Sequence, residues 1–188
     1  MSETIKISIG PKGTVISKKR ELVSYLDPIL KLKTPEWDFN KQPMHPINLS
    51  NEMISLLQEY KGIGLACPQV GYSYRMFVMG VNDQIIAYFN PKILEESKET
   101  QILEEGCLSF PKLKLVVRRP ETVHVEYYDY NGKRHETKFA GLTSRLFQHE
   151  LNHLDGILFT SKCSRNKLEM AIKKAAKENV FYKIKDLV

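Results

Sequence analysis

The residues best suited to catalytic chemistry lie in the segment QHELNHLDG, at positions 148–156. If this segment is helical, His149 and His153 stand at positions i and i+4, so both imidazoles project from one face about one turn apart. Glu150 lies one residue round the helix, where a carboxylate can act as a base without binding a metal itself. This spacing is typical of a helix that holds a catalytic divalent metal.

A catalytic metal usually has three protein ligands and one open position, so a third ligand is needed. Downstream, Phe159 stands where the longer pattern HExxHxxGxxH would place a histidine, and Glu178 lies in a lysine-rich segment. Upstream, the stretch LEEGCLSFP offers Cys107. The spacing alone leaves both Glu178 and Cys107 open as the third ligand.

Three short motifs, in this order, resemble those of the peptide deformylase family. They are GIGLACPQ at 62–69, EGCLS at 105–109 and QHELNHLDG at 148–156. The stretch LDPILKLKTP at 26–35 is similar to an N-terminal element of the same family, and the resemblance covers roughly residues 23–162. It implies a metallohydrolase that acts on a linear amide and removes the N-terminal formyl group from formyl-methionine of newly synthesised polypeptides.

The resemblance also implies a role for particular residues. One divalent metal per chain would be held by Cys107, His149 and His153; Fe²⁺ is the expected metal, and Zn²⁺ or Ni²⁺ could occupy the same site. Glu150 would take the proton of the attacking water and deliver it to the departing amine. The side-chain amide of Gln69 and the backbone N–H of Leu108 would stabilise the oxyanion.

The same resemblance predicts how nascent formyl-methionyl peptides bind. Leu103, Leu142 and Leu146 would form the walls of an apolar pocket for methionine. The peptide backbone would pair, as an added strand, with the extended residues Ile63, Gly64 and Phe110.

Three positions depart from the usual family pattern. Arg145 stands where an aliphatic residue normally lines the methionine pocket, and we expect its stem to form a wall while the guanidinium reaches water. Cys67 replaces an alanine, and we expect a small apolar residue whose free thiol could lie near the metal. Asn152 replaces an aspartate, and we expect it to point outward.

The order of predicted helices and strands indicates an α+β fold, with mainly antiparallel or mixed sheets packed around a central helix that carries HExxH. Period-two patterns predict strands at 74–81, 84–91, 113–120 and 122–130, and Asn131-Gly132 predicts a hairpin turn. Helices are expected at 48–62 with Ser50 as N-cap, at 143–155, and at 165–180 as a C-terminal amphipathic helix with Leu168, Ile172, Ala175 and Val180 on one side. Residues 5–17 predict a further hairpin.

The length of 188 residues suits a single catalytic domain, 1–188, with an N-terminal extension at 1–22 and a basic helix and tail at 163–188. The chain has no apolar run near the roughly 20 residues that span a bilayer, and no signal-peptide pattern, so we expect neither membrane insertion nor secretion. Three cysteines, an odd number, favour the cytoplasm or another reducing compartment where translation occurs.

The basic residues gather at the C-terminus. From Lys162 to the end the chain carries eight basic and three acidic residues, so 8 − 3 = +5 of the formal net charge of +6 lies there. A lysine-rich helix face ordinarily serves solubility. The resemblance to the family implies a second use, docking to the polyanionic ribosome, with Leu168 and Ile172 holding the helix to the body. We expect deletion after about Arg165 to leave the hydrolysis of short peptides nearly intact.

Two other functions remain open from the sequence. A zinc endopeptidase would need a downstream ligand such as Glu178 and would leave Cys107 inert. A ribosome- or RNA-binding module without catalysis could rest on the basic segment alone, although aromatic residues are not interleaved with the basic ones. The remaining histidines, which offer no such cluster, are expected to be structural or to face solvent: His45, His124 and His135.

Overall fold

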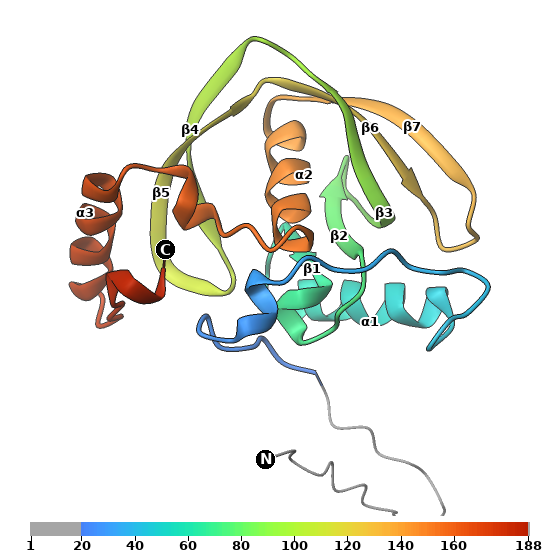
Figure 1. Cartoon of the computed structure of the whole chain (residues 1–188), viewed down its shortest axis with the longest axis horizontal. Helices are drawn as coiled ribbons and strands as arrows, with labels where there is room; N and C mark the ends of the chain where they lie inside the picture. Colours follow the sequence, from blue (N-terminus) through green and yellow to red (C-terminus); the bar gives the residue numbers. More distant parts are fainter. Residues whose placement is uncertain (1–19, 188) are drawn as a thin grey trace, which may run out of the picture.

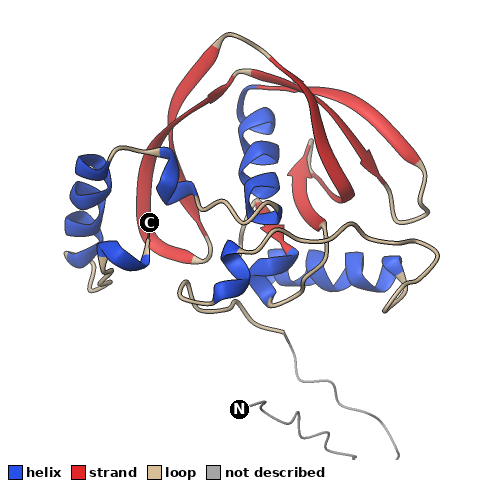
Figure 2. Ribbon diagram, in the orientation of Figure 1, coloured by secondary structure: helices blue, strands red, loops and turns tan. Residues whose placement is uncertain are grey.

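The computed structural model describes residues 20–187. The hairpin predicted at 5–17 lies outside these residues. The described part is an α+β fold with two antiparallel sheets and three α-helices, which confirms the predicted fold class (Figure 1, Figure 2). None of the helices within residues 20–187 combines the length and the apolar character that crossing a membrane requires.

The larger sheet has five antiparallel strands in the order β1-β2-β3-β6-β7. These strands are β1 (Gly64–Ala66), β2 (Met76–Val81), β3 (Gln84–Glu96), β6 (Thr122–Tyr128) and β7 (Arg134–Ala140). The turn between β6 and β7 contains Asn131-Gly132, as predicted. Gly132 has a φ of +75°, which an L side chain rarely adopts, and Asp129 Oδ1 accepts hydrogen bonds from the backbone N–H groups of Asn131 and Lys133.

The smaller sheet is a two-stranded hairpin of β4 (Thr100–Cys107) and β5 (Phe110–Pro120). The sequence pattern predicts most of β5 but not β4. β4 carries exposed side chains along most of its length, so it lacks the alternation of apolar and polar residues that marks a half-buried strand. Its last residue is Cys107, so the hairpin ends at a predicted metal ligand.

The first helix, α1 (Pro46–Glu59), begins before the predicted start. The predicted N-cap at Ser50 is wrong, because its hydroxyl lies inside the helix and donates to the carbonyl of Pro46. His45 is the N-cap, with Nδ1 accepting from the N–H of Ile47, and Pro46 occupies the first helical position, where a missing N–H costs nothing. Apolar residues of α1 pack against the sheet in the first core cluster, among them Leu49, Met53, Leu56 and Leu57.

The second helix, α2 (Gly141–Leu154), stands between the larger sheet and the β4–β5 hairpin (Figure 1). Phe147, Leu151 and Leu154 pack against the larger sheet in a core cluster with Phe77 and Tyr88. Arg145 and His149 of α2 instead bind residues of the hairpin, whereas the buried Glu150 packs on Gly64 of β1. This division of faces places His149 and His153 beside Cys107.

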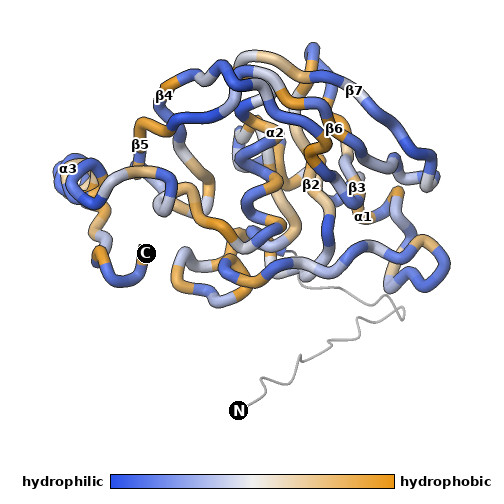
Figure 3. Tube along the Cα trace, turned by 45° about the horizontal axis from the view of Figure 1, so that its top comes forward, coloured by the Kyte–Doolittle hydropathy of each residue, from blue (hydrophilic) through white to orange (hydrophobic). Residues whose placement is uncertain are grey.

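The third helix, α3 (Arg165–Ala176), is shorter than predicted, and Val180 lies beyond its end. Figure 3 shows α3 mostly in the blue of hydrophilic residues. Its buried side, with Leu168 and Ala175, packs against β5, and the chain beyond the helix adds the buried residues Tyr182 and Leu187 to the same core cluster. Deletion after Arg165 would expose that cluster to water, which argues against a dispensable segment, and the retention of hydrolysis after such a deletion stays a prediction.

A glycine at the end of α2 allows two segments to meet. Gly156 has a φ of +69°, and a Cβ built there would lie 2.6 Å from the carbonyl oxygen of Lys31 and 2.7 Å from the carbonyl carbon of Lys31. Nearby, the N–H of Thr34 donates to the carbonyl of Leu154 at 2.8 Å. Gly156, the last residue of the QHELNHLDG motif, thus lies where two backbone segments approach each other closely.

We predict that Gly156→Ala lowers the free energy of unfolding more than Gly141→Ala does. Gly141 has a φ of +60° but open space around its Cβ position. Alanine there should therefore lower the free energy of unfolding only through the unfavourable backbone conformation, by about 1–2 kcal/mol. At Gly156 the clash with backbone atoms adds about 1–3 kcal/mol. Urea unfolding of both variants measures the difference, and equal losses would contradict the close approach.

Candidate metal centre and active site

Three predicted metal ligands meet where α2 faces the β4–β5 hairpin. The ligand atoms of Cys107, His149 and His153 lie within 4.8 Å of one another, and Cys107 Sγ is 3.2 Å from His153 Nε2. The two histidines are buried, with exposed fractions of 7% and 1%. Within residues 20–187 this is the only group of three or more potential protein ligands at such distances.

The protonation chemistry of these residues fits a divalent cation. Burial lowers the pKa of His153 well below its usual value, and the positive charges of His149 and Arg119 add to this effect, so the imidazole is neutral and can offer a lone pair. Burial, followed by the negative charge of Glu150, raises the pKa of the Cys107 thiol to about 12. A thiol in this position becomes a thiolate only when a cation compensates its charge, which is the coupling expected at a metal site.

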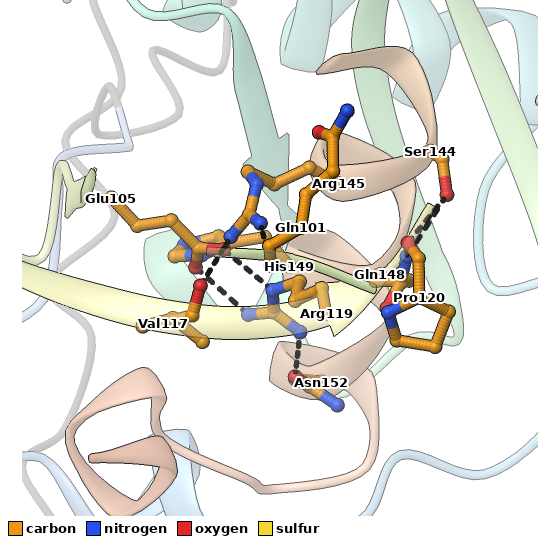
Figure 4. A network of polar contacts seen from close by, with 10 residues as sticks. All are labelled: Gln101, Glu105, Val117, Arg119, Pro120, Ser144, Arg145, Gln148, His149 and Asn152. Carbon is orange, nitrogen blue, oxygen red and sulfur yellow. Dashed lines mark hydrogen bonds and ion pairs between the residues drawn. The ribbon is translucent and has the colours of Figure 1, made fainter. Parts of the chain in front are cut away.

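A buried carboxylate, Glu105, orients His149. Its two oxygens accept four hydrogen bonds, which come from Arg119 Nε at 2.6 Å, Arg119 Nη2 at 2.9 Å, Arg145 Nη1 at 2.5 Å and His149 Nδ1 at 3.1 Å (Figure 4). Because Nδ1 of His149 is engaged by the carboxylate, Nε2 is left as the ligand atom. Burial acts to raise the pKa of Glu105, but the hydrogen bonds from His149 and Arg119 outweigh it and hold the pKa at about 2.

Arg145 belongs to this cluster, and the expectation that its guanidinium reaches water is wrong. The residue is 5% exposed, and besides Glu105 its guanidinium donates to the carbonyls of Val117 at 3.0 Å and Gln101 at 2.8 Å. One side chain of α2 therefore binds both strands of the hairpin. Such fork-like donation to several acceptors is a property of arginine that an aliphatic residue cannot reproduce.

Asn152 is also not outward as predicted. It is half-buried, and its Oδ1 accepts from Arg119 Nη1 at 2.8 Å. Arg145, His149 and Asn152 stand at positions i, i+4 and i+7 of α2, so they share one face of the helix. All three contact Glu105 of β4 or Arg119 of β5 (Figure 4), and this face therefore aligns the helix with the hairpin.

Glu150 lies beside the candidate centre with one oxygen free. It is 3% exposed, and Oε2 has no hydrogen-bond partner among the described residues. Burial raises the pKa of Glu150 to about 8, against the opposing charge of Arg119 and with a further rise from Glu105. The other oxygen packs on Gly64, where a built Cβ would lie 2.3 Å from Glu150 Oε1, so a larger residue at this position would displace the carboxylate.

Gln69 reaches the centre from a short 3₁₀ helix, η2 (Cys67–Val70). Its Oε1 accepts from the N–H of Ala66 at 2.8 Å, which fixes which end of the amide faces the site. Its Nε2 donates to Ser109 Oγ at 3.1 Å and, over a long 3.5 Å contact, to Cys107 Sγ. The amide is therefore held as a donor directly beside a candidate ligand.

Cys67, in the same short helix, packs away from the centre. Its residue is fully buried in the first core cluster, and Sγ contacts Met76 Sδ at 3.8 Å. The interpretation as a small apolar residue fits this position, whereas the idea of a thiol near the metal does not. The other three histidines serve local structure, with His45 capping α1, His124 close to Glu95 and Glu136, and His135 paired with Asp129.

A cavity of about 380 Å³ opens onto the candidate centre. Eight of the predicted site residues line it: Ile63, Gly64, Gln69, Cys107, Leu108, Phe110, His149 and Glu150. His153 is buried and does not line the cavity. Leu103 and Leu142 do not line the cavity and are 38% and 73% exposed. Leu146 also stands outside the lining, but its Cδ1 lies 2.9 Å from the Cβ position of Gly64.

Sequence reasoning missed three residues of the site: Glu105, Arg119 and Ser109. Glu105 and Ser109 stand at the two ends of the EGCLS motif, so their place beside Cys107 was a usable signal. Arg119 gives no such signal, because it lies in a strand with an ordinary apolar pattern and meets Glu105 only through the pairing of β4 with β5. Glu178, the alternative third ligand, pairs with Lys112 at 3.1 Å and lies outside the cluster.

Comparison with known proteins gives a consistent result. A model of the family described as polypeptide deformylase matches residues 19–169. A peptide deformylase from Thermotoga neapolitana is 42% identical over 137 residues, which cover 72% of this chain and 82% of the relative. One from Christiangramia forsetii is 34% identical over 186 residues, which cover 87% of this chain and 94% of the relative. The crystal structure of peptide deformylase from Thermotoga maritima is similar with a TM-score of 0.74 at 35% identity, covering 79% of this chain and 99% of that one.

We predict that Glu105→Gln lowers the free energy of unfolding of the metal-free protein by about 3–5 kcal/mol. The amide keeps the volume but leaves two buried guanidiniums without a counter-charge. The matched control is Glu104→Gln, because Glu104 pairs with Lys114 at the surface, and its loss should cost less than about 1 kcal/mol.

The difference in folding stability between the wild type and Glu105→Gln should depend on pH. Folding lowers the pKa of Glu105 from 4.5 to about 2, so the stability it contributes is present above about pH 4.5 and is lost as the pH falls towards 2. The advantage of the wild type over Glu105→Gln should shrink across this range. A difference in the free energy of unfolding that does not change with pH would contradict the role given to the Glu105 carboxylate. So would a loss in Glu105→Gln that is no larger than the loss in Glu104→Gln.

Proposed function

The chain belongs to the peptide deformylase family and removes the N-terminal formyl group from formyl-methionine of newly synthesised polypeptides, and we propose that Cys107, His149 and His153 hold its catalytic metal. The observation that carries this proposal is the convergence of these three ligand atoms within 4.8 Å at the inner end of a cavity. A metal bound there would supply Lewis-acid chemistry, polarising the formyl carbonyl and making water a better nucleophile. One thiolate and two imidazoles suit Fe²⁺, Zn²⁺ or Ni²⁺, and we propose Fe²⁺, one per chain.

Glu150 is proposed as the group that moves the proton. Its free Oε2 takes a proton from the attacking water and returns it to the amine nitrogen as the carbon–nitrogen bond breaks. Burial at 3% exposure excludes bulk water, which strengthens the interaction of this carboxylate with the reacting groups. The packing of Gly64 against Oε1 restricts the carboxylate and lets a substrate backbone approach it closely.

The developing oxyanion needs donors, and we propose the side-chain amide of Gln69 and the backbone N–H of Leu108. Gln69 is 1% exposed and is oriented by the N–H of Ala66, so its Nε2 requires little reorganisation to donate. One of its two present bonds is the long contact to Cys107 Sγ, which can be given up at small cost. Leu108 follows the candidate ligand Cys107 and lines the cavity.

The nascent peptide is proposed to bind between Ile63 and Phe110. β1 is an edge strand of the larger sheet, so it can accept an added strand, and Gly64 and Phe110 both line the cavity. Of the residues predicted to contact the methionine side chain, Leu146 lies nearest this path, against Gly64. Contacts of methionine with Leu103 and Leu142 stay predictions, since both residues are exposed outside the cavity.

We also propose that the chain acts as one catalytic unit in a reducing compartment where translation occurs. All three cysteines, Cys67, Cys107 and Cys163, are free thiols. The C-terminal segment packs into a core cluster that includes Phe110 of the cavity, so it belongs to the catalytic body. A separate peptidase function has no support from Glu178, whose carboxylate is paired with Lys112.

We predict that Glu150→Gln retains the metal but loses at least about a hundredfold in kcat. The amide cannot accept the proton from water, and general acid–base catalysis is typically worth about 10² to 10⁴-fold. Metal analysis of anaerobically purified wild type and variant, together with hydrolysis of a formyl-Met peptide, tests the assignment. A metal-free variant, or one with wild-type turnover, would refute the role of Glu150.

Ribosome association is a further part of the proposal. The basic residues of the C-terminal segment, including Lys173 and Lys174, are exposed, while Leu168 and Ala175 hold α3 to the body. Exposed positive charge can bind ribosomal phosphates in a salt-dependent way.

We predict that Lys173→Glu combined with Lys174→Glu weakens co-sedimentation with ribosomes at low salt while the fold is kept. The matched control is Lys133→Glu with Lys138→Glu, which reverses the same number of exposed charges on the β6–β7 hairpin. Pelleting that is equal for both double variants and the wild type across a salt series would exclude docking through α3.

A further inference from the structure

Three lysines line the cavity that leads to the candidate centre: Lys61, Lys112 and Lys114, which we call the rim lysines. Lys61 precedes Ile63 and Gly64 on one side, and the other two belong to β5, which begins at Phe110 on the other side. All three are exposed, whereas Glu150, the one acidic residue in the lining, is buried. The outer part of the cavity therefore carries positive charge on both sides.

The present partners of the rim lysines are weak. Lys112 pairs with Glu178 at 3.1 Å and Lys114 with Glu104 at 3.3 Å, and about half of each side chain is exposed. Such surface pairs contribute little, so a carboxylate brought by a ligand can replace them. Lys61 forms no ion pair within the described part of the chain. The positive charge is therefore available to a molecule that enters the cavity.

The backbone gives no reason for lysine at two of these positions. Lys61 has a φ of +52° and Lys112 a φ of +63°, both in the left-handed region that L side chains rarely adopt. Lys61 directly follows the C-cap of α1, where glycine is the usual residue, and the N–H of Gly62 donates to the carbonyl of Leu57 there. Lysine is present at both positions against the local backbone preference, which points to a use for its charge.

We propose that the rim lysines make this enzyme select formyl-methionyl chains that carry aspartate or glutamate among the first residues after methionine. The inference rests on the proposed path of the peptide between Ile63 and Phe110. An extended chain advances by about 3.3 Å per residue, so the residues after methionine leave the buried centre and pass the exposed rim. Acidic side chains there meet lysines on both sides, and a positively charged cleft also raises their local concentration.

The test compares kcat/KM for formyl-Met peptides that are neutral, or that carry Glu or Lys at the second, third or fourth position. We expect the best acidic peptide to exceed the neutral one by about three- to tenfold, mainly through KM, with a preference that declines as ionic strength rises. The peptide with Lys should be the poorest substrate. A ratio of one between the acidic and neutral peptides at low salt would overturn the proposal.

Variants assign the preference to particular residues. Lys61→Gly and Lys112→Gly remove the charge where the backbone favours glycine, so the fold is kept and the ratio of acidic to neutral hydrolysis should fall towards one. Lys61→Glu should favour the peptide that carries Lys. Lys92→Gln is the matched control, because Lys92 pairs with Glu36 away from the cavity, and its loss changes the net charge by the same amount.

The outcomes separate this proposal from the function it rests on. The neutral peptide reports deformylation itself, and failure to hydrolyse it would overturn the proposed function together with this inference. With the neutral peptide hydrolysed, a ratio that is unchanged in the glycine variants, or reduced equally in Lys92→Gln, would overturn selection by the rim lysines alone.

Discussion

The candidate centre depends on one buried interaction, the fourfold hydrogen bonding of the Glu105 carboxylate. Two of the predicted ligands lie on α2 and the third lies at the end of β4, so no local rule of secondary structure fixes their relative position. Glu105 binds Arg145 and His149 of α2 and Arg119 of β5, and thereby joins the helix to the hairpin. Such a buried ionic cluster is costly to break, since each guanidinium left alone would be an unpaired charge in the interior.

Several features of the site follow from this alignment. Once α2 is held against the hairpin, Cys107 Sγ lies 3.2 Å from His153 Nε2, and the Nε2 atom of His149 is the one left to bind a metal. Glu150 is turned towards the cavity and against Gly64, where burial raises the pKa of its carboxyl. Gln69 completes the arrangement from a separate loop. The fold therefore holds these polar and charged groups in fixed positions. Fixed dipoles and charges favour catalysis because they need little reorganisation during the reaction.

The sequence predicts the parts of this arrangement that are local. The i, i+4 spacing of two histidines and the apolar period of α2 are readable because helix geometry repeats over a few residues. The Glu105–Arg119 pair is not readable, because it depends on the register of two strands, and Arg145 joins Glu105 across 40 positions of sequence. The prediction that the guanidinium of Arg145 reaches water is wrong for the same reason, since its buried acceptors lie far away in the sequence. The predicted N-cap of α1 is wrong because Ser50 fits the general preference for this position, whereas Pro46 sets the actual start of the helix.

The proposed centre requires that one sulfur and two nitrogens of this chain bind the metal. X-ray absorption spectroscopy of the zinc-loaded protein tests it directly, because scattering by sulfur and nitrogen is distinguishable and the distances are characteristic. We expect one sulfur at about 2.3 Å, two imidazole nitrogens at about 2.0–2.1 Å, and loss of the sulfur contribution in Cys107→Ser. A first coordination shell of nitrogen and oxygen only in the wild-type protein would contradict it.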